Sequence, residues 1–509
     1  MKLEQLLNST QILSIEGAVT SLAEIEISQL CYDSRQVTPG ALFFALPGAR
    51  AKGTAFVQNA IELGAAAVVA EEAISGIAIP VILVREARRA MGEMAACFYQ
   101  YPSHYLSVCG VTGTNGKTTT TFLVRHLCEA NGRRCGLMGT VHYILPGVIE
   151  EAARTTPESI DLQEMMQRMS EGGFKAVALE ASSHAIVQER LCGTEFDVAI
   201  FTNLTQDHLD FHGSMEAYFD AKTLLFKNLA LQYEKRGKAV INIDDRYGRL
   251  LLDRLPDQLS VTTYGQSVHA DFRAADIRFS ATGTQFCLEA RGRSYLVRSP
   301  LVGLFNVYNA LGALASATAM GLELRRAVKA LETVPQVPGR LERLPGKQPF
   351  QVYVDYAHTP DALENVLQTL HQLKRGRLIV VFGCGGDRDR AKRPLMAAAA
   401  ERYGDEIIVT TDNPRTEDPL AIIADVKKGF QSDRYHSICD REEAIYEAIR
   451  RAEPQDIVVI AGKGHENYQE VHGVKNPFDD VVVAQRAMRD SQEWKREEIH
   501  RDRSDGRDG

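Results

Sequence analysis

A glycine-rich segment between an apolar run and a helical pattern most strongly constrains what this chain can fold into. The segment covers residues 113–120, GTNGKTTT, and it follows the apolar run 106–111. Apolar residues recur at helical spacing from Phe122 to Leu127. Strand, glycine loop, Lys-Thr and helix in this order form a phosphate-binding loop, whose backbone N–H groups and helix N-terminus attract anions. Lys117 and Thr118 would then reach the terminal phosphates and Mg²⁺, so we predict that the chain handles ATP.

The spacing inside this loop is unusual, because only two residues separate Gly113 from Gly116. Phosphate-binding loops commonly have four residues between the first glycine and the Gly-Lys pair, and here Val111 stands at the position of that first glycine. A glycine-rich turn that binds nothing is the alternative interpretation. The order of strand, lysine, hydroxyl residue and helix favours the phosphate site.

Length and composition restrict the class of protein. A chain of 509 residues is too long for one hydrophobic core, so about two to four domains are expected. Its 45% hydrophobic and 24% charged residues are typical of a soluble globular protein. The net charge of −8, with acidic and basic residues mixed throughout, argues against a nucleic-acid-binding surface as the main function.

Neither membrane insertion nor secretion is expected. No apolar run reaches membrane-spanning length, and residues 1–5 lack the apolar core of a signal peptide. Nine cysteines are scattered without a Cys-x-x-Cys pair, so neither a zinc site nor a disulfide framework is expected. A reducing cytoplasm fits this pattern.

Apolar runs separated by helical patterns predict an α/β fold in which a central, mostly parallel sheet is covered on both faces. Pro102 stops a helix near residues 99–103, and the segment VPQVPG at 334–339 reads as a second linker. We therefore predict domains at 1–100, 101–336 and 337–497, followed by a disordered polar tail at 498–509. The expected strands lie at 41–46, 66–70, 106–111, 176–179, 198–201, 239–243, 352–354, 378–382, 406–410 and 457–460.

Polar residues follow two of the expected central strands, at the edge where open α/β sheets bind ligands. Glu180 comes after strand 176–179 and could take Mg²⁺ directly or through water. His208 comes after strand 198–201 and could supply a nitrogen ligand to a second metal ion. Taken alone, Glu180 could instead be a helix cap or an ion-pair partner, and His208 a hydrogen-bonded loop residue. Neither alternative explains why both follow strands of the sheet that carries the phosphate loop.

Several segments in order along the chain resemble the Mur ligase family, ATP-dependent enzymes that extend the peptide stem of the cell-wall precursor. The resemblance spans nearly the whole chain except the tail, and the short glycine spacing is the form found in this family. The segments are GTNGKT at 113–118, EASSH at 180–184, TNL at 202–204, DHLD at 207–210, LVGLFNVYN at 301–309 and DYAHTP at 355–360.

The resemblance implies three domains: a nucleotide-sugar domain, a central P-loop ATPase and a C-terminal Rossmann-like domain that brings the amino acid. It also implies a mechanism in which a precursor carboxylate attacks the ATP γ-phosphate, giving an acyl phosphate and ADP. An amine then attacks the acyl phosphate and expels inorganic phosphate. Because both reacting groups are anions, cations must bring them together, and Lys117 with two Mg²⁺ would do so.

The resemblance assigns catalytic, metal and nucleotide residues. Lys222 matches a carbamylated lysine, whose carbamate would ligate Mg²⁺ where an ammonium would be repelled; from its type alone it would be a solvated helix lysine. The catalytic set is Lys117, Glu180, His208 and Lys222, and the metal set is Thr118, Glu180, His208 and carbamylated Lys222. ATP would contact Gly113, Thr114, Asn115, Gly116, Lys117, Thr118, Thr119, Asn309, Arg340, Asp355 and His358, although caps and domain-interface hydrogen bonds remain alternatives for the last four.

Two features point to the family member that adds the third residue of the stem. The segments 32–35 and 40–45 resemble its uridine-binding domain, where Ala49, Arg50 and Ala51 would contact uridine mainly through their backbone. Arg190 suits a carboxylate or phosphate through its planar fork, whereas an isolated Ser or Thr is more often a local cap. The residues matching contacts to UDP-N-acetylmuramoyl-L-alanyl-D-glutamate are Tyr32, Ser34, Thr155, Thr156, Ser182, Gln188 and Arg190.

The segment 412–415, Asp-Asn-Pro-Arg, resembles the motif of enzymes that add meso-diaminopimelate. This amino acid differs from lysine by a carboxylate at its far end, to which Arg415 offers a bidentate donor on a loop stiffened by Pro414. A turn without ligand is the alternative. Glu466 could bind an ammonium. The full set of matching residues is Arg388, Asp412, Asn413, Pro414, Arg415, Gly462 and Glu466.

Two classes of alternative function remain open: other ligases and a non-catalytic nucleotide-binding protein. Within enzymes, the chain could add L-lysine, or be a folylpolyglutamate-synthase-like ligase that shares the loop form and the modified lysine. A non-catalytic nucleotide-binding scaffold would show damage at Lys117, Glu180 or His208, and the sequence shows none. We expect small-molecule substrates, a bacterial cytoplasmic location and a monomer.

Overall fold

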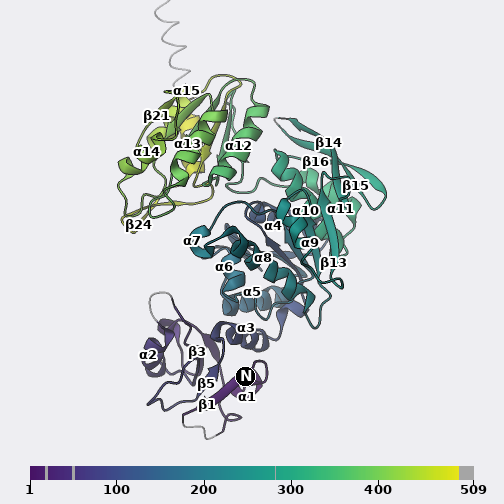
Figure 1. Ribbon diagram of the computed structural model, residues 1–509, viewed down its shortest axis with the longest axis vertical. Coiled ribbons are helices and arrows are strands. Elements are labelled where there is room, and N and C mark those ends of the chain that lie inside the picture. Colours follow the sequence, from purple (N-terminus) through teal and green to yellow (C-terminus); the bar gives the residue numbers. More distant parts are fainter. Residues whose placement is uncertain (18–20, 49–51, 281, 492–509) are drawn as a thin grey trace, which may run out of the picture.

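The computed structural model describes residues 1–17, 21–48, 52–280 and 282–491. The chain forms three α/β domains in sequence order along the long axis of the molecule, with the N-terminal domain at the bottom of Figure 1 and the C-terminal domain at the top. This confirms the predicted fold class. The tail predicted at 498–509 and the predicted uridine contacts Ala49, Arg50 and Ala51 lie outside the described residues.

The N-terminal domain is built on a sheet in the order β1-β5-β4-β3-β2. Strands β2 to β5 pair in parallel, and β1 pairs with β5 in antiparallel orientation. Both faces of this sheet are buried, which explains the continuous apolar runs in the sequence. Its elements are α1 (Leu3–Leu7), β1 (Ile12–Glu16), β2 (Gln29–Cys31), β3 (Ala41–Phe44), α2 (Val57–Glu62), β4 (Ala67–Ala70), β5 (Val81–Val84) and α3 (Ala87–Phe98).

The central domain has a sheet in the order β16-β15-β14-β13-β12-β11-β6-β10-β7-β8-β9. Its elements up to α8 are β6 (Ser107–Thr112), α4 (Lys117–Ala130), β7 (Cys135–Met138), β8 (His142–Leu145), β9 (Val148–Glu151), α5 (Ser159–Glu171), β10 (Ala176–Glu180), α6 (Ser183–Val187), β11 (Val198–Phe201), α7 (Leu209–His212) and α8 (Met215–Ala230). The remaining elements are β12 (Lys238–Asn242), α9 (Arg246–Leu252), β13 (Ser260–Gly265), β14 (Phe272–Ser280), β15 (Gly283–Ala290), β16 (Arg293–Ser299), α10 (Leu304–Ala319) and α11 (Leu324–Ala330).

Strands β7, β10, β6, β11, β12 and β13 form the parallel centre of this sheet. Alternate residues of β6 enter opposite cores: Val108 packs on the side of α5 and α8, and Cys109 on the side of α4 and α10. The central parallel sheet covered on both faces is therefore confirmed.

Antiparallel pairing completes both edges of the central sheet, although β14 itself pairs in parallel with β13, and the sequence interpretation missed this feature. Strands β8 and β9 extend one edge and β14 to β16 the other. Arg291 and Gly292, with φ of 53° and 70°, connect β15 to β16, a tight hairpin geometry. Arg-Gly is a weaker hairpin signal than Asn-Gly or Asp-Gly, so these strands were hard to predict.

The C-terminal domain has a sheet in the order β17-β18-β22-β19-β20-β21, parallel apart from the edge strand β17. A separate hairpin, β23 with β24, projects from it. The elements are β17 (Glu342–Arg343), β18 (Gln351–Asp355), α12 (Pro360–Leu373), β19 (Leu378–Phe382), α13 (Lys392–Tyr403), β20 (Glu406–Val409), α14 (Pro419–Lys427), β21 (Tyr435–Ser437), α15 (Arg441–Arg451), β22 (Ile457–Ala461), β23 (Tyr468–Val471) and β24 (Val474–Pro477), followed by helical residues from 480 to 491.

Side-chain contacts tie neighbouring domains together. Tyr32 donates a 2.7 Å hydrogen bond to Asp161 on α5, and Arg88 on α3 forms a 2.9 Å ion pair with Glu158. All nine cysteines are free thiols in the structure. Among the residues that the structure describes, no helix combines the length and apolar character needed to span a bilayer.

Candidate active site

The loop between β6 and α4 has the backbone of a phosphate cradle. Gly113 and Gly116 have φ of 145° and 85°, a region that residues with a Cβ rarely adopt. A Cβ at Gly113 would lie 1.9 Å from Thr202 Oγ1, and one at Gly116 would lie 2.4 Å from Asn309 Oδ1. Glycine is therefore required at both positions, and the short spacing leads directly into the N-terminus of α4.

The half-buried Lys117 and the buried Lys222 meet beneath this loop. Lys117 Nζ donates hydrogen bonds to the carbonyl oxygens of Gly113 at 3.0 Å and Thr114 at 2.8 Å. Lys222 Nζ, on α8, donates to the same Gly113 oxygen at 2.9 Å, and this residue is only 1% exposed. Burial lowers the pKa of Lys117, and burial together with the Lys117 charge lowers the pKa of Lys222 well below its usual range.

A cavity of about 1090 Å³ opens over the loop, between the central and C-terminal domains. Asn115 Nδ2 and Thr205 Oγ1 both donate to Asp361 at the start of α12, at 2.9 and 3.1 Å, which joins the two domains beside it. The predicted site residues lining it are Thr114, Asn115, Gly116, Lys117, Thr118, Thr119, Thr155, Thr156, Glu180, Ser182, Arg190, His208, Lys222, Asn309, Arg340, Asp355 and His358. Gly113 is bonded to both lysines beneath it.

Glu180 is the last residue of β10, and His208 caps α7 in the loop that follows β11, so both come after the predicted strands. The Glu180 carboxylate accepts bonds from Thr140, at 2.8 Å from its N–H and 3.0 Å from its hydroxyl. His208 has φ of 54°, its ring meets that of His184 edge-on at 4.9 Å, and burial lowers its pKa to about 4. Within the described residues, no three His, Cys, Asp or Glu side chains gather closely enough to hold a metal ion by themselves.

Three of the predicted nucleotide residues, Arg340, Asp355 and Asn309, each make hydrogen bonds beside the cavity. Arg340 donates to Thr118 Oγ1 at 3.2 Å and lies over the Tyr356 ring. Asp355, at the end of β18, accepts the N–H of Ala357 at 2.7 Å, and burial raises its pKa to about 6. Asn309 Oδ1 accepts from Thr120 at 3.3 Å, directly beside the loop. The side chains of two domains thus converge on one space.

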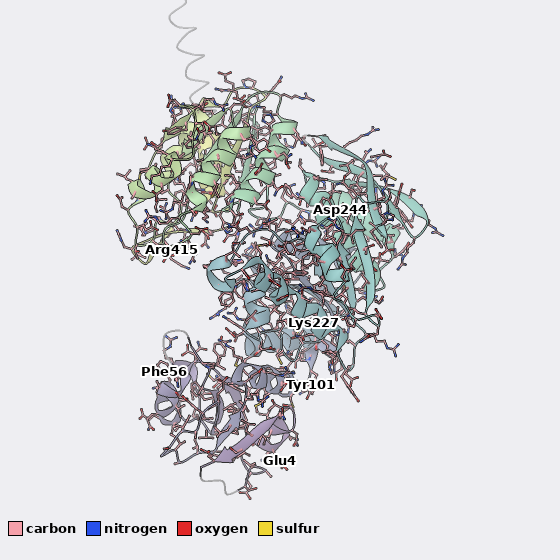
Figure 2. The ribbon with its side chains drawn as sticks, viewed as in Figure 1. Glu4, Phe56, Tyr101, Lys227, Asp244 and Arg415 are labelled. Atoms are coloured by element: carbon pink, nitrogen blue, oxygen red, sulfur yellow. The ribbon has the colours of Figure 1, made fainter. Side chains whose placement is uncertain are left out.

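One wall of the cavity was not predicted. It combines apolar and aromatic side chains from β14 and α10 with a polar rim. Tyr308 donates to Asp244 at 2.9 Å and accepts from Gln266 at 2.7 Å; Asp244 is labelled in Figure 2. The wall residues are Ile277, Phe279, Leu304, Phe305 and Tyr308. Tyr308 lies next to the predicted Asn309, and this neighbour could have pointed to Tyr308 as a cavity residue. The wall residues on β14 had no comparable sequence signal, because that strand was not predicted.

Arg190 organises the predicted precursor-binding side chains. It donates to the Thr156 carbonyl at 3.1 Å and to Gln188 Oε1 at 2.6 Å, and its Nε lies 3.2 Å from Glu158. The Thr156 hydroxyl donates to the Glu180 carbonyl at 2.7 Å. Ser182 caps α6, which is the local role that its residue type also allows.

Tyr32 and Ser34 do not line the cavity. Ser34 lies buried in a 3₁₀ turn of the N-terminal domain, and Tyr32 bonds to α5 of the central domain. In this structure Tyr32 therefore connects domains.

The Asp-Asn-Pro-Arg loop follows β20, as predicted, and contacts the glycine loop that follows β19. The Gly386 N–H donates to the Asn413 carbonyl at 2.9 Å, and Arg415 Nη1 donates to the Gly386 carbonyl at 2.7 Å. Arg415 has φ of 52°, and its Nε lies 3.4 Å from Glu470 Oε2 on β23. Figure 2 labels Arg415 at the lower left edge of the C-terminal domain.

The other predicted amino-acid residues lie around this loop. Asn413 Nδ2 donates to Glu466 Oε2 at 2.8 Å. A Cβ on Gly462 would lie 3.6 Å from Asp412, and Arg388 is exposed. Arg388, the segment 412–415, Gly462 and Glu466 do not line the large cavity, so they form a separate group of side chains.

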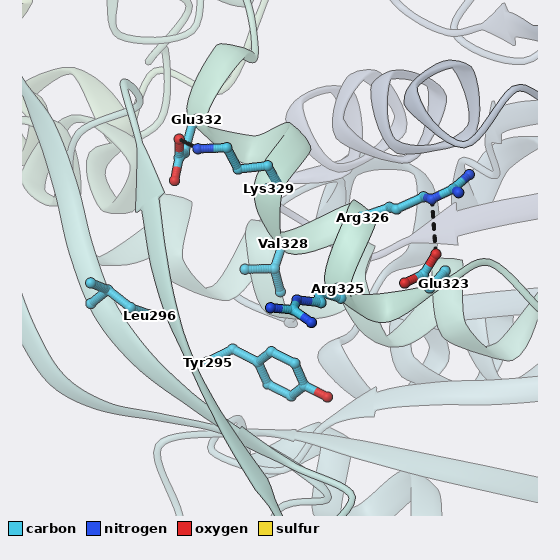
Figure 3. A pocket seen from close by; sticks show the side chains of 8 residues that line it. All are labelled: Tyr295, Leu296, Glu323, Arg325, Arg326, Val328, Lys329 and Glu332. Carbon is cyan, nitrogen blue, oxygen red and sulfur yellow. Dashed lines mark hydrogen bonds and ion pairs between the residues drawn. The ribbon is translucent and has the colours of Figure 1, made fainter.

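A smaller hollow of about 380 Å³ lies between β16 and α11, far along the sheet from the phosphate loop (Figure 3). Its charged side chains are mostly paired: Arg326 with Glu323 at 2.9 Å, and Lys329 with Glu332. It contains none of the predicted site residues.

Family models match all three domains: the Mur ligase family catalytic domain at residues 26–99, the Mur ligase middle domain at 111–317 and the Mur ligase glutamate ligase domain at 339–464. The chain is 46% identical over 469 residues to the UDP-N-acetylmuramoyl-L-alanyl-D-glutamate–2,6-diaminopimelate ligase of Geobacillus kaustophilus, covering 91% of this chain and 95% of that one.

Solved structures also match the fold of this chain. A UDP-N-acetylmuramoyl-L-alanyl-D-glutamate–2,6-diaminopimelate ligase matches 97% of this chain and 99% of its own, with 37% identity and a TM-score of 0.70. A folylpolyglutamate synthase of Mycobacterium tuberculosis, complexed with ADP and AMPPCP, shares the fold over 73% of this chain and 91% of its own, with 20% identity and a TM-score of 0.59. The chain therefore belongs to the Mur ligase family.

Proposed function

We propose that this chain is the ATP-dependent ligase that joins meso-diaminopimelate to UDP-N-acetylmuramoyl-L-alanyl-D-glutamate during synthesis of the peptidoglycan precursor. The observation that carries the proposal is the pairing of a phosphate cradle with a separate loop that presents Arg415. The names of the similar proteins support the same reaction. We further propose that the chain acts on these small-molecule substrates as a monomer in the bacterial cytoplasm.

In this proposal the precursor carboxylate attacks the γ-phosphorus of ATP, ADP leaves, and an acyl phosphate forms. The amine of diaminopimelate then attacks the acyl carbon and releases inorganic phosphate. Lys117 and the N–H groups at the start of α4 would hold the phosphates. Arg190 would hold an anionic group of the precursor through its fork.

Thr118, Glu180 and His208 would hold Mg²⁺, with oxygen donors from the first two. Bound Mg²⁺ would screen the negative charges of carboxylate and phosphate and stabilise charge in the transition state. His208 suits this role because its lowered pKa leaves the ring nitrogens without a second proton at neutral pH.

The contacts beneath the loop support the proposed carbamylation of Lys222. Lys117 and Lys222 both donate to the Gly113 carbonyl, so two ammonium groups would repel each other there. A lysine with a lowered pKa has a neutral amine, which is the form that attacks CO₂. The resulting carbamate would carry a negative charge, reverse the repulsion from Lys117 and supply a carboxylate-like metal ligand.

The unpredicted wall of the cavity suits a purine base. A flat apolar ring would fit against Ile277, Phe279 and Phe305, and the Asp244–Tyr308–Gln266 rim offers polar groups at its edge. Asp355 would then accept hydrogen bonds from ribose hydroxyl groups.

The test is phosphate release with ATP, Mg²⁺ and the UDP-dipeptide precursor, together with meso-diaminopimelate, L-lysine or no amino acid. Of these three conditions, we expect phosphate release only in the one that contains meso-diaminopimelate. Release with lysine alone would keep the ligase and contradict the role of Arg415. Absence of release with every amine would favour the folate-type ligase or a scaffold.

A further inference from the structure

A fully buried lysine lies at the centre of the proposed amino-acid site. Lys463 follows β22, and its side chain is 0% exposed. Its Nζ donates to Asn413 Oδ1 and to Glu466 Oε2, each at 3.0 Å, and lies 3.7 Å from Asp412 Oδ1. One ammonium therefore contacts three of the side chains that the proposed function assigns to diaminopimelate.

These contacts fix the relative positions of two loops. Asn413 Oδ1 accepts from Lys463 and from the Glu470 N–H at 2.9 Å, while Asn413 Nδ2 donates to Glu466. With its acceptor oxygen and amide nitrogen both bonded, Asn413 is held in one orientation. Lys463 thus joins the loop after β20 to the loop after β22.

The formal charges around Lys463 divide into two groups. In the inner group, Lys463 opposes Asp412 and Glu466. The Arg441 guanidinium also acts on both carboxylates, but its own partner Asp480 offsets its charge, so the group keeps one net negative charge. In the outer group, Arg415 pairs with Glu470. A Cβ on Gly385 would lie 2.9 Å from Arg415 Nη1 and 3.9 Å from Arg388 Cγ, so both arginine side chains flank this glycine.

This distribution matches the far end of diaminopimelate, which carries one ammonium and one carboxylate. The inner group would take the ammonium and the outer group the carboxylate. Without Lys463 the inner group would carry two negative charges, and a ligand end with a net positive charge would be favoured over a zwitterionic one.

We propose that Lys463 is a positioning residue that sets the net charge of the inner group and so helps to select a zwitterionic amino-acid end. The inference rests on the proposed function, because it assumes that these loops bind the amino acid. Lys463 need not touch the substrate: it holds Glu466 and Asn413 in place and neutralises one of the two carboxylates of the inner group.

The experiment compares Lys463→Met, Lys463→Arg and Lys475→Met with the unmodified enzyme, using phosphate release with meso-diaminopimelate and L-lysine. Lys463 and Lys475 both lie over the Tyr468 ring, at 5.5 and 4.0 Å from its centre. Lys475 is a matched control because it is exposed on β24. In Lys463→Met we expect the KM for diaminopimelate to rise about tenfold or more, with the KM values for ATP and precursor unchanged. The ratio of kcat/KM for lysine to that for diaminopimelate should also rise. Lys463→Arg keeps the positive charge, so it should restore much of the preference for diaminopimelate.

A variant with the opposite charge change keeps the test decisive if Lys463→Met does not fold. Asp412→Asn makes the inner group neutral, so use of 2-aminopimelate, which lacks the far ammonium, should rise relative to diaminopimelate. Unchanged ratios in either folded variant, or equal losses for every substrate, would overturn the inference. Absence of diaminopimelate-dependent release by the unmodified enzyme would instead contradict the proposed function.

Discussion

At the scale of single residues, Arg415 has the most specific proposed role. Its backbone is left-handed, and its guanidinium is aimed by the Gly386 carbonyl and by Glu470. The guanidinium is therefore already oriented before a ligand binds, which lowers the entropic cost of a bidentate contact.

We predict that Arg415→Ala raises the KM for diaminopimelate by an amount equivalent to roughly 2–5 kcal/mol, because a charged bidentate contact is lost. Arg415→Lys should recover little, since an ammonium cannot reproduce the planar fork. Steady-state phosphate release measures this. Arg390→Ala is the control, because Arg390 pairs with Asp425 outside the site. An unchanged KM for diaminopimelate would contradict the assigned specificity.

Lys222 is the second residue whose chemistry depends on its surroundings. We predict that Lys222→Ala loses activity and regains part of it when a short carboxylic acid such as acetate is added, because the acid replaces the carbamate. Lys227→Ala is the matched control: Lys227 lies on the same helix, α8, but is exposed (Figure 2). Full activity of Lys222→Ala without added acid would remove Lys222 from the mechanism.

At the scale of elements, a fully buried ion pair supports the loops of the amino-acid site. Arg441, the first residue of α15, and Asp480 are both 0% exposed and lie 2.7 Å apart. Arg441 also donates to the carbonyls of Thr411 and Ala461, each at 3.1 Å. These residues directly precede Asp412 and Gly462, so one guanidinium fixes the starting points of both loops.

We predict that Arg441→Met destabilises the C-terminal domain by about 3–5 kcal/mol, because it leaves Asp480 buried without its partner. Chemical denaturation measures the loss. Arg486→Met breaks a pair of the same 2.7 Å length between Arg486 and Glu442, but this pair is exposed. It should cost below about 1 kcal/mol. Equal losses in the two variants would contradict the burial argument.

At the scale of the whole molecule, the cavity depends on the contact between two domains. The central domain supplies the phosphate loop, and the C-terminal domain supplies Arg340, Asp355 and His358. Asp361 accepts from Asn115 of the loop and from Thr205 of the central domain, so it aligns the two halves.

We predict that Asp361→Ala raises the KM for ATP by about tenfold or more, because hydrogen bonds to a charged group contribute about 1.5–3 kcal/mol each. Glu364→Ala is the control on the same helix, since Glu364 pairs with Arg402 within the C-terminal domain. Solution scattering should show a more extended molecule for Asp361→Ala than for Glu364→Ala. Identical scattering and an unchanged KM would contradict the role of Asp361.

Local residue order was enough to predict the contiguous parts of this protein. Strand, glycine loop and helix at 107–130 are contiguous, so their order predicted the phosphate cradle, and Glu180 and His208 were found because parallel strands end at a common edge. The roles of Lys222 and of the segment 412–415 came from the family resemblance, since an isolated lysine or turn carries no such information.

Only the tertiary structure decided which distant side chains meet. Lys117 and Lys222 converge on one carbonyl, Lys463 binds Asn413 and Glu466, and Asp361 joins two domains. The antiparallel edges of the central sheet, including the β14 wall of the cavity, also emerged only there. The physical reason is that periodicity and turn chemistry act over a few residues, whereas these contacts depend on how whole elements pack and on which buried charges can find a partner.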